Sequence, residues 1–301
     1  MKRTFISLLL LIILGLCVSQ PAGAELEASL PIAENLELKT YRNVSVGGKL
    51  KGYDPQGGEL KFVLCTEPVK GTVELEEDGS FVYTPKEGKK GRDYFGYKVS
   101  DSEGRLSQEA TVIIRLEKQK NDVFYPDMQG RAEEYSAVLL SEKDIITGQK
   151  LGGMYCFEPD SPVSLGEFVS LSMLVSDKIT PAVLSTGYGD DSAIPVWMKP
   201  YAAAAAMSGA YSGKTINEEL VFGPDTNITK AEAALILDRA LGISKVSYIA
   251  SEDAVFDETV QACINLESCG IIEESSLSED ILTRADMAAM LAAALALMEN
   301  R

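Results

Sequence analysis

The chain has 301 residues, a length typical of about two domains, and its 45 acidic residues outnumber 28 basic ones, which gives a net charge of −17. This acidic balance argues against nucleic acid or anionic membranes as general partners. The sequence contains no histidine, which excludes Ser-His-Asp and Cys-His catalysis and any zinc site with histidine ligands.

Residues 1–24 have the composition and order of a secretory signal peptide. Lys2 and Arg3 precede the apolar run FISLLLLIILGL, and the small residues AGA end at Ala24. The run is shorter than the roughly 20 residues that a membrane-spanning helix needs, although a retained N-terminal anchor is the alternative. We therefore expect a secreted protein without a membrane span, and loss of the two basic residues leaves it a charge of −19.

Four cysteines follow the signal peptide: Cys65, Cys156, Cys263 and Cys269. An even number in an exported chain permits disulfides. Cys263 and Cys269 lie in a predicted helix, however, where six residues rise about 9 Å, which exceeds the roughly 7 Å that a disulfide spans between Cα atoms. We expect mostly free thiols that pack as small core residues.

Residues 31–118 are predicted to form β-strands. Apolar residues alternate with polar ones in three stretches: Val73, Leu75, Phe81 and Tyr83; Phe95, Tyr97 and Val99; Val112, Ile114 and Leu116. Asp78 and Gly79 interrupt the first stretch, as in a hairpin turn. Several short strands separated by such turns predict an all-β sandwich.

The stretches YDPQGGELKF, GTVELEEDGSFVYTP and GRDYFGYKVSDSEG also resemble the bacterial immunoglobulin-like and cadherin-like repeats of secreted surface proteins. The resemblance implies a spacer or an adhesion module. Four acidic residues in the turns have the oxygen ligands that calcium prefers: Asp54, Glu59, Asp101 and Glu103. We favour a turn-forming role, since aspartate and glycine together explain these turns, and predict no metal site.

After the polar link LEKQKND, the chain becomes rich in alanine and in strong helix formers. Aromatic–acid pairs recur at intervals of about 65 residues: Phe124 and Asp127, Tyr188 and Asp191, Phe256 and Asp257. FEPDSPVSLGE (157–167) also matches FGPDTNITKAE (222–232), and SLSEDILTRAD keeps the last part of this pattern. We predict three helical repeats at 123–178, 186–243 and 252–301, the third shortened.

Each repeat contains a hydroxyl residue three positions before an acid, just ahead of an apolar run. The pairs are Ser164 and Glu167, Thr229 and Glu232, and Thr283 and Asp286. This spacing predicts a capping box, in which the hydroxyl accepts a backbone N–H of the first turn and the acid reaches back to the cap N–H. Asp286 is shorter than glutamate and is expected to cap less well. The first helical position holds Leu165, Lys230 and Arg284 in turn, and a cation there is not needed for capping.

The motifs TRAD and TKAE, with FGPDTNI, and the tryptophan that follows YGDDSAIPV, resemble the S-layer homology domain. The resemblance spans residues 123–301. It implies that three copies pack as an all-α, pseudo-threefold bundle behind the immunoglobulin-like sandwich. It also implies attachment to a secondary cell-wall polysaccharide, with an acidic or pyruvylated sugar contacted by the motif arginine.

By this resemblance Arg284, Lys230 and Trp197 are the candidate glycan-binding residues. Lys230 supplies charge without the planar fork of arginine, and Leu165 does not match. Helix N-termini would add N–H donors for an anion. We therefore predict a non-enzymatic cell-surface protein without a cofactor. The alternative is an assembly or adhesion protein whose repeats contact other surface proteins and bind no glycan.

Overall fold

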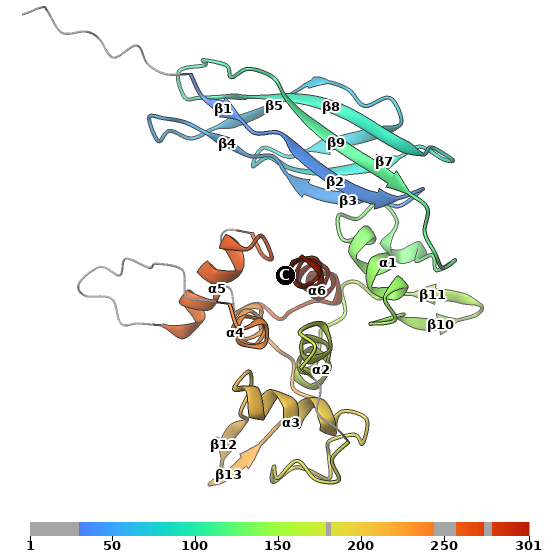
Figure 1. The fold of residues 1–301 in the computed structure, drawn as a ribbon, viewed down its shortest axis with the longest axis vertical. Coiled ribbons are helices and arrows are strands. Elements are labelled where there is room, and N and C mark those ends of the chain that lie inside the picture. Colours follow the sequence, from blue (N-terminus) through green and yellow to red (C-terminus); the bar gives the residue numbers. More distant parts are fainter. Residues whose placement is uncertain (1–29, 179–181, 244–256, 274–278, 301) are drawn as a thin grey trace, which may run out of the picture.

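The computed structural model describes residues 30–178, 182–243, 257–273 and 279–300. It has an all-β part up to residue 117 and a mainly helical part from residue 126 onward (Figure 1). The predicted signal peptide lies outside the described residues. Among the helices that are described, none is both long and apolar enough to cross a membrane.

The all-β part is a sandwich of two main sheets. One sheet has the strand order β2-β9-β8-β5, with β2 parallel to β9, and the other has the order β3-β7-β6. A short pair, β1 with β4, completes it. The strands are β1 (Ile32–Ala33), β2 (Leu36–Tyr41), β3 (Val46–Lys49), β4 (Gly52–Tyr53), β5 (Lys61–Thr66), β6 (Gly71–Leu75), β7 (Ser80–Pro85), β8 (Gly91–Ser100) and β9 (Ala110–Glu117).

The alternating residues form the sandwich core, as predicted. Leu75 faces Phe81 across the β6–β7 hairpin, and the intervening turn contains Gly79 with a φ of 87°. The side chains of β7, β8 and β9 that point inward are nearly all buried. Tyr83 is fully buried, and its hydroxyl donates to Asp93 Oδ2 at 2.9 Å, so its polar atom stays paired inside the core.

Asp54 and Asp101, two of the four acids considered for calcium, organise their own turns. Asp54 accepts the N–H groups of Gln56 and Gly58, at 3.0 and 2.9 Å. Asp101 accepts the N–H groups of Glu103 and Arg105 and the Arg105 Nε. Across the described residues, no group of three or more acidic or thiol side chains is placed to hold a metal ion.

The second part contains seven helices and two hairpins in the described ranges. Figure 1 looks nearly along α2, α4 and α6, and α2 packs against both of the others. The helices are η1 (Pro126–Met128), α1 (Glu134–Glu142), α2 (Leu165–Val175), α3 (Lys199–Ser208), α4 (Lys230–Leu241), α5 (Glu258–Ser268) and α6 (Arg284–Glu299). The hairpins are β10 (Gln149–Leu151) with β11 (Met154–Cys156), and β12 (Lys214–Ile216) with β13 (Glu219–Val221).

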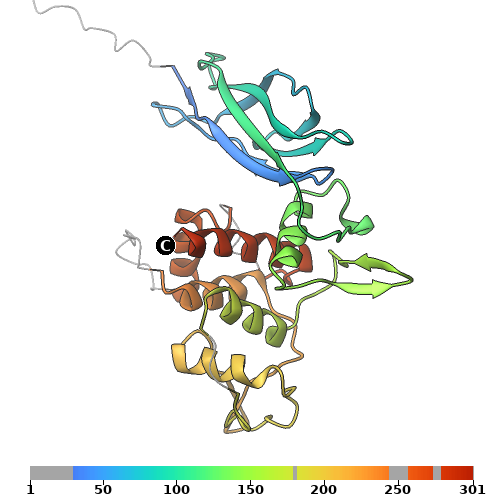
Figure 2. The same ribbon diagram turned by 45° about the vertical axis from the view of Figure 1, so that its right-hand side comes forward.

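These hairpins correct the prediction of purely helical repeats. Each has strands of three residues, which are too short to show an alternating pattern. Their turns did carry a signal, since Gly152 and Gly153, like Asn217 and Glu218, have positive φ, as two-residue hairpin turns require. Figure 2 shows β10–β11 projecting from the helical part.

The repeated aromatic–acid pairs are Tyr125 with Asp127, and Tyr188 with Asp190. Asp127 accepts the N–H of Phe157, and Asp190 accepts the N–H of Phe222. Each tyrosine ring packs against that same phenylalanine, at 5.3 and 5.5 Å between centroids. The pairing predicted from sequence was therefore displaced by one residue in each of these two repeats.

Other residues of the predicted aromatic–acid pairs do not make these contacts. Phe124 is about half exposed, and Asp191 pairs with Lys199 instead. Phe256 lies outside the described residues, whereas Asp257 is the N-cap of α5. Cys65, Cys156, Cys263 and Cys269 are all free thiols, as predicted, but only Cys263 is buried, so the expectation of core packing is wrong for the exposed Cys65.

The two parts of the molecule are joined by backbone hydrogen bonds between β3 and the start of α1. Gly47 N–H donates to Ala132 O at 2.8 Å, and Tyr135 N–H donates to Ser45 O at 3.1 Å. A Cβ at Gly47 would lie 2.6 Å from the Ala132 Cβ, so glycine permits this close approach. The contact fixes how far the sandwich stands from the helices.

Candidate functional site

The three predicted caps lie at the N-termini of α2, α4 and α6. Each of Ser164, Thr229 and Thr283 accepts, at 3.2 Å, the N–H of the residue three positions on. Glu232 and Asp286 also accept the N–H of their own cap residue, which completes two capping boxes. The shorter side chain of Asp286 therefore reaches the cap after all.

Glu167 departs from the predicted capping box, because its side chain bonds to a different part of the chain. Its Oε1 accepts from Arg284 Nη1 at 2.7 Å, across the junction between α2 and α6. At α2 the cap thus consists of the Ser164 hydroxyl alone, and the acid joins α2 to α6.

The segments that precede the three helices bond to one another in a closed ring. Val163 N–H donates to Leu282 O, Leu282 N–H donates to Ile228 O, and Ile228 N–H donates to Val163 O, at 3.0, 2.9 and 3.2 Å. All three residues are fully buried. These bonds lie at the centre of the helical part and bring the three helix N-termini together.

The first N–H of each helix donates to a neighbouring segment in the opposite cyclic order to that of the ring. The bonds are Leu165 N to Thr226 O, Lys230 N to Asp280 O, and Arg284 N to Ser161 O, at 2.7, 2.9 and 3.0 Å. The second N–H of α2 and of α6 donates likewise, to Pro224 O and Pro159 O. Because these donors already have partners, the expectation that they bind an anion is wrong for them.

Arg284 is held on several sides. Besides the Glu167 pair, its Nε donates to Phe157 O at 2.8 Å, and its guanidinium lies 5.2 Å from the centre of the Phe157 ring. Its side chain is only 14% exposed. The arginine therefore lies at the junction of α2 and α6, where two of its five N–H donors and one face of its guanidinium serve contacts within the chain.

Lys230 is more accessible. Its Nζ lies 3.1 Å from Asp286 Oδ2, and its side chain is 32% exposed. At the third junction, between α2 and α4, the position equivalent to Lys230 and Arg284 holds the buried Leu165. The acid of the α4 motif, Glu232, pairs with Lys214 of β12 at 2.7 Å. Burial raises the pKa of Glu232, but Lys214 and the Thr229 N–H outweigh this effect and hold it below its ordinary value.

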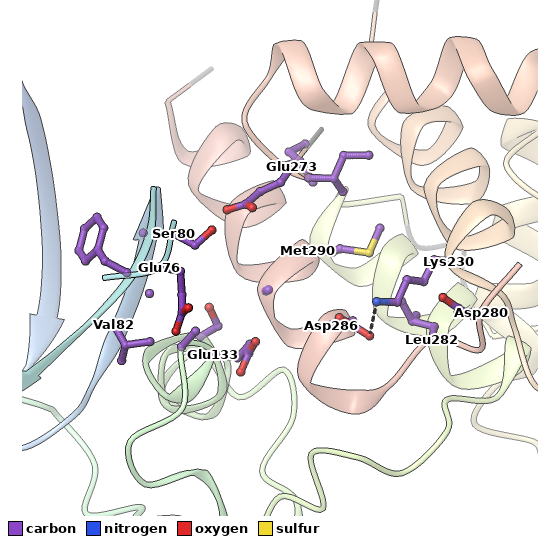
Figure 3. A pocket seen from close by; sticks show the side chains of 18 of the residues that line it. Glu76, Ser80, Val82, Glu133, Lys230, Glu273, Asp280, Leu282, Asp286 and Met290 are labelled. Atoms are coloured by element: carbon purple, nitrogen blue, oxygen red, sulfur yellow. Dashed lines mark ion pairs between the residues drawn. The ribbon is translucent and has the colours of Figure 1, made fainter. Parts of the chain in front are cut away.

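Lys230 lines a cavity of about 680 Å³ between the sandwich and the helical part, here called the interdomain cavity (Figure 3). One wall is the outer face of β3, β7 and β6; the others come from the start of α1, from α4 and α6, and from residues 271–273 and 280–282. Among the described residues, its charged lining consists of Lys230 and six acids: Glu74, Glu76, Glu133, Glu273, Asp280 and Asp286. Sequence reasoning missed these acids, since they come from separate segments without a shared motif.

A smaller cavity of about 250 Å³ lies beside the N-terminus of α4. The described residues of its lining include Glu232, Asp257 and Glu279, and none of them is basic. Trp197, just before α3, is 60% exposed and lines neither cavity. Thus the structure places Lys230 and Arg284 at adjoining junctions and does not bring Trp197 to the same cavity.

Two family models match the sequence. Residues 29–118 match the bacterial cadherin-like domain, and residues 187–234 match the S-layer homology domain. Both families are binding or anchoring modules rather than catalytic domains, and the second indicates attachment at the cell surface or cell wall. The comparison with curated proteins gives no match.

Solved structures resemble only part of the chain. An endo-fucoidan hydrolase of glycoside hydrolase family 107 is 19% identical, over 29% of this chain and 15% of its own, with a TM-score of 0.24. The sialic acid binding region of a Streptococcus sanguinis adhesin is 15% identical, over 33% and 32%, with a TM-score of 0.22. Fibronectin(III)-like modules of Clostridium thermocellum CbhA are 13% identical, over 32% and 51%, with a TM-score of 0.22. The chain spans less than a sixth of the first of these proteins.

Proposed function

We propose that this cell-surface protein attaches non-covalently to a secondary cell-wall polysaccharide through three repeats around a pseudo-threefold axis. The immunoglobulin-like sandwich is then the module that it displays. The observation that carries the proposal is the ring of backbone bonds through Val163, Ile228 and Leu282. A closed ring of identical bonds is expected when three equivalent units pack around one axis.

Other features support the equivalence of the repeats. The middle repeat, 186–243, contains the segment that matches the S-layer homology model. The first repeat, 123–178, has the same tyrosine–aspartate pair, hairpin and capped helix. The third, 252–301, shares the capped helix and the place in the ring, and part of it lies outside the described residues.

Of the three predicted glycan-binding residues, we propose Lys230 and Trp197 as contacts and assign Arg284 to stability. The ammonium of Lys230 has three donors, of which one faces Asp286, so the others can donate to sugar hydroxyls. Trp197 offers an exposed ring on which a sugar can pack. An acidic or pyruvylated sugar beside Lys230 would meet the carboxylates of the cavity, which disfavours that part of the hypothesis.

The test is sedimentation of the full chain with purified cell walls, before and after extraction of the polysaccharide. We expect retention only on unextracted walls. Trp197→Ala should lower the affinity about tenfold, as for an exposed aromatic anchor, whereas the neighbouring exposed Val196→Ala should not. Equal retention of wild type and Trp197→Ala would remove Trp197 from the site.

The alternative is assembly with other surface proteins, and one observation favours it. Both hairpins expose apolar side chains: Leu151 and Met154 on the first, Ile216 and Leu220 on the second. Exposed apolar groups of this kind are frequent at protein contacts. Equal retention on extracted and unextracted walls would favour this alternative over polysaccharide binding.

A further inference from the structure

The interdomain cavity is built jointly by the two parts of the chain. Gly47, Val82 and Glu74 form one cross-strand row of its wall, and Lys49, Ser80 and Glu76 adjoin them. The opposite wall includes Leu282 and Met290 of the helical part. Figure 3 shows Glu76 and Glu133 pointing toward the space between the sandwich and α6.

The charge of the lining restricts what can enter. Among the described lining residues Lys230 is the one cation against six carboxylates; Asp286 pairs with it, and Lys49 beside the wall pairs with Glu273 at 3.5 Å. Within the described residues, the exposed carboxylates of Glu74 and Glu76 have no hydrogen-bonding or ionic partner. A second anion would therefore be repelled, and a group with positive charge would be attracted.

The carboxylates are also spread over opposite walls. No three of them are placed to hold a metal ion in the described part of the chain. The cavity volume of about 680 Å³ is in the range of sites for drug-sized ligands, and Val82 and Met290 add apolar surface. This arrangement fits an extended ligand with several positive groups and apolar faces better than it fits a compact cation.

A basic peptide is the less favoured occupant. A peptide commonly binds beside a sheet by adding a strand to an open edge. Of the two edges of this sheet, β3 is already bonded to Ala132 at the rim of the cavity, and the adjoining Ser45 is bonded to Tyr135, so a strand could be added at the β6 edge alone. A sugar chain needs no such edge, because its hydroxyl and amino groups donate directly to carboxylates.

We propose that the interdomain cavity binds a segment of wall polysaccharide whose sugars carry free, protonated amino groups. The proposal rests on the proposed function and adds the chemical class of the sugar. It also makes the sandwich part of the binding site, since Glu74 and Glu76 belong to it. The carboxylates hold the ammonium groups, while the apolar residues pack against the faces of the sugar rings.

The experiment titrates the full chain with three oligosaccharides by calorimetry at pH 6. The probes are a tetramer of β-1,4-linked glucosamine, its N-acetylated counterpart, and an acidic tetramer of galacturonate. We expect the amino tetramer to bind at least about tenfold more tightly than the other two, because only it carries ammonium groups. Equal affinity for the N-acetylated tetramer would overturn the proposal.

A pair of double variants locates the binding and controls for net charge. Glu74→Gln with Glu76→Gln should weaken binding of the amino tetramer about fivefold to tenfold, as expected for two partly exposed ion pairs. Glu59→Gln with Glu87→Gln removes the same charge from exposed residues that do not line the cavity, and should leave affinity nearly unchanged. Equal effects of the two pairs would mean unspecific attraction and would reject the cavity.

Wall sedimentation separates this proposal from the proposed function. If the wild-type chain sediments with walls, but Glu74→Gln with Glu76→Gln still binds the amino tetramer normally, the cavity is rejected as the binding site and wall attachment stands. A wild-type chain that does not sediment rejects wall attachment, and with it the role proposed for the cavity. The basic tetrapeptide tetralysine is a further probe. If Glu74→Gln with Glu76→Gln weakens binding of tetralysine but not of the amino tetramer, the cavity is a peptide site and the proposed sugar ligand is rejected.

Discussion

The α6–α2 junction and the α4–α6 junction place a basic residue at the same helical position, yet they use it differently. Arg284 binds Glu167, the Phe157 carbonyl and the face of the Phe157 ring, and is largely buried. Lys230 has one ionic partner, Asp286, and lines an open cavity. The difference follows from side-chain chemistry, since a planar guanidinium can satisfy several partners at once and a lysine ammonium can leave donors for a ligand.

The comparison teaches that a repeated motif need not repeat its role. At α6–α2 the acid of the motif bonds to the other helix and not to its own cap, whereas at α4–α6 it stays in its capping box and meets a cation as well. The first junction is thus expected to support stability, and the second to remain available for binding.

Arg284→Ala should produce the largest effect and would test the structural half of this comparison. It leaves Glu167 and the Phe157 carbonyl without a largely buried partner, which should lower the free energy of unfolding of the helical part by about 2–3 kcal/mol. Urea unfolding followed by circular dichroism at 222 nm measures this. Arg284→Lys should lose less, because it keeps the charge; a loss below that of Lys230→Ala would contradict the assignment.

Loss of a cap should have a smaller effect that also differs between the helices. Thr283→Ala removes both bonds of a capping box at α6 and should cost about 1 kcal/mol. Ser164→Ala removes a single bond at α2 and should cost about half as much. The same urea unfolding measures both, and a larger cost at Ser164 would show that Glu167 contributes to its own cap.

The hairpin and the helix caps could be predicted from the sequence, whereas the contacts between distant helices could not. The alternation around Asp78 and Gly79 predicted the β6–β7 hairpin, since a turn and its flanking strands are adjacent in sequence. Cap spacing likewise lies within one helical turn. By contrast, Arg284 and Glu167 are 117 residues apart, and no local pattern names the partner of a side chain at that distance.

The candidate site shows the same limit. Resemblance indicated Lys230, but the acids around it come from both parts of the chain, and Gly47 brings those parts together by permitting the close approach of Ala132. The composition shows the net negative charge of the chain. The gathering of six acids around one cavity depends on how the sandwich packs against the helical part. The hypothesis of an acidic sugar, made from the sequence, could therefore not take these carboxylates into account.

Lys230→Ala should have little effect on stability. Lys230 and Asp286 are each 32% exposed, and a pair with this exposure contributes less than about 1 kcal/mol. Equilibrium unfolding of the variant should stay within that margin of wild type, while wall retention falls. A loss as large as that of Arg284→Ala would show that the two junctions play the same role.

The third junction provides the smallest expected effect, through pH. Glu232 has a lowered pKa in the folded chain, because Lys214 and the Thr229 N–H outweigh the effect of its burial. A carboxyl group with a lowered folded pKa stabilises the fold above its unfolded pKa of about 4.3, and this contribution is lost as pH falls through the folded value.

Glu232→Gln should therefore be less stable than wild type at pH 7, and the difference in melting temperature should shrink once the pH falls below about 4.3. The difference should stay small, since both Glu232 and Lys214 are more than a third exposed and solvent screens the pair. Lys214→Ala is the matched control. In this background, where Glu232 has lost its cation, Glu232→Gln should lower the melting temperature at pH 7 by less than it does in the wild type. A difference that stays constant between pH 7 and pH 3 would show that Glu232 acts through its cap bonds alone. The third junction would then depend on the packing of Leu165, without a charged contact between repeats.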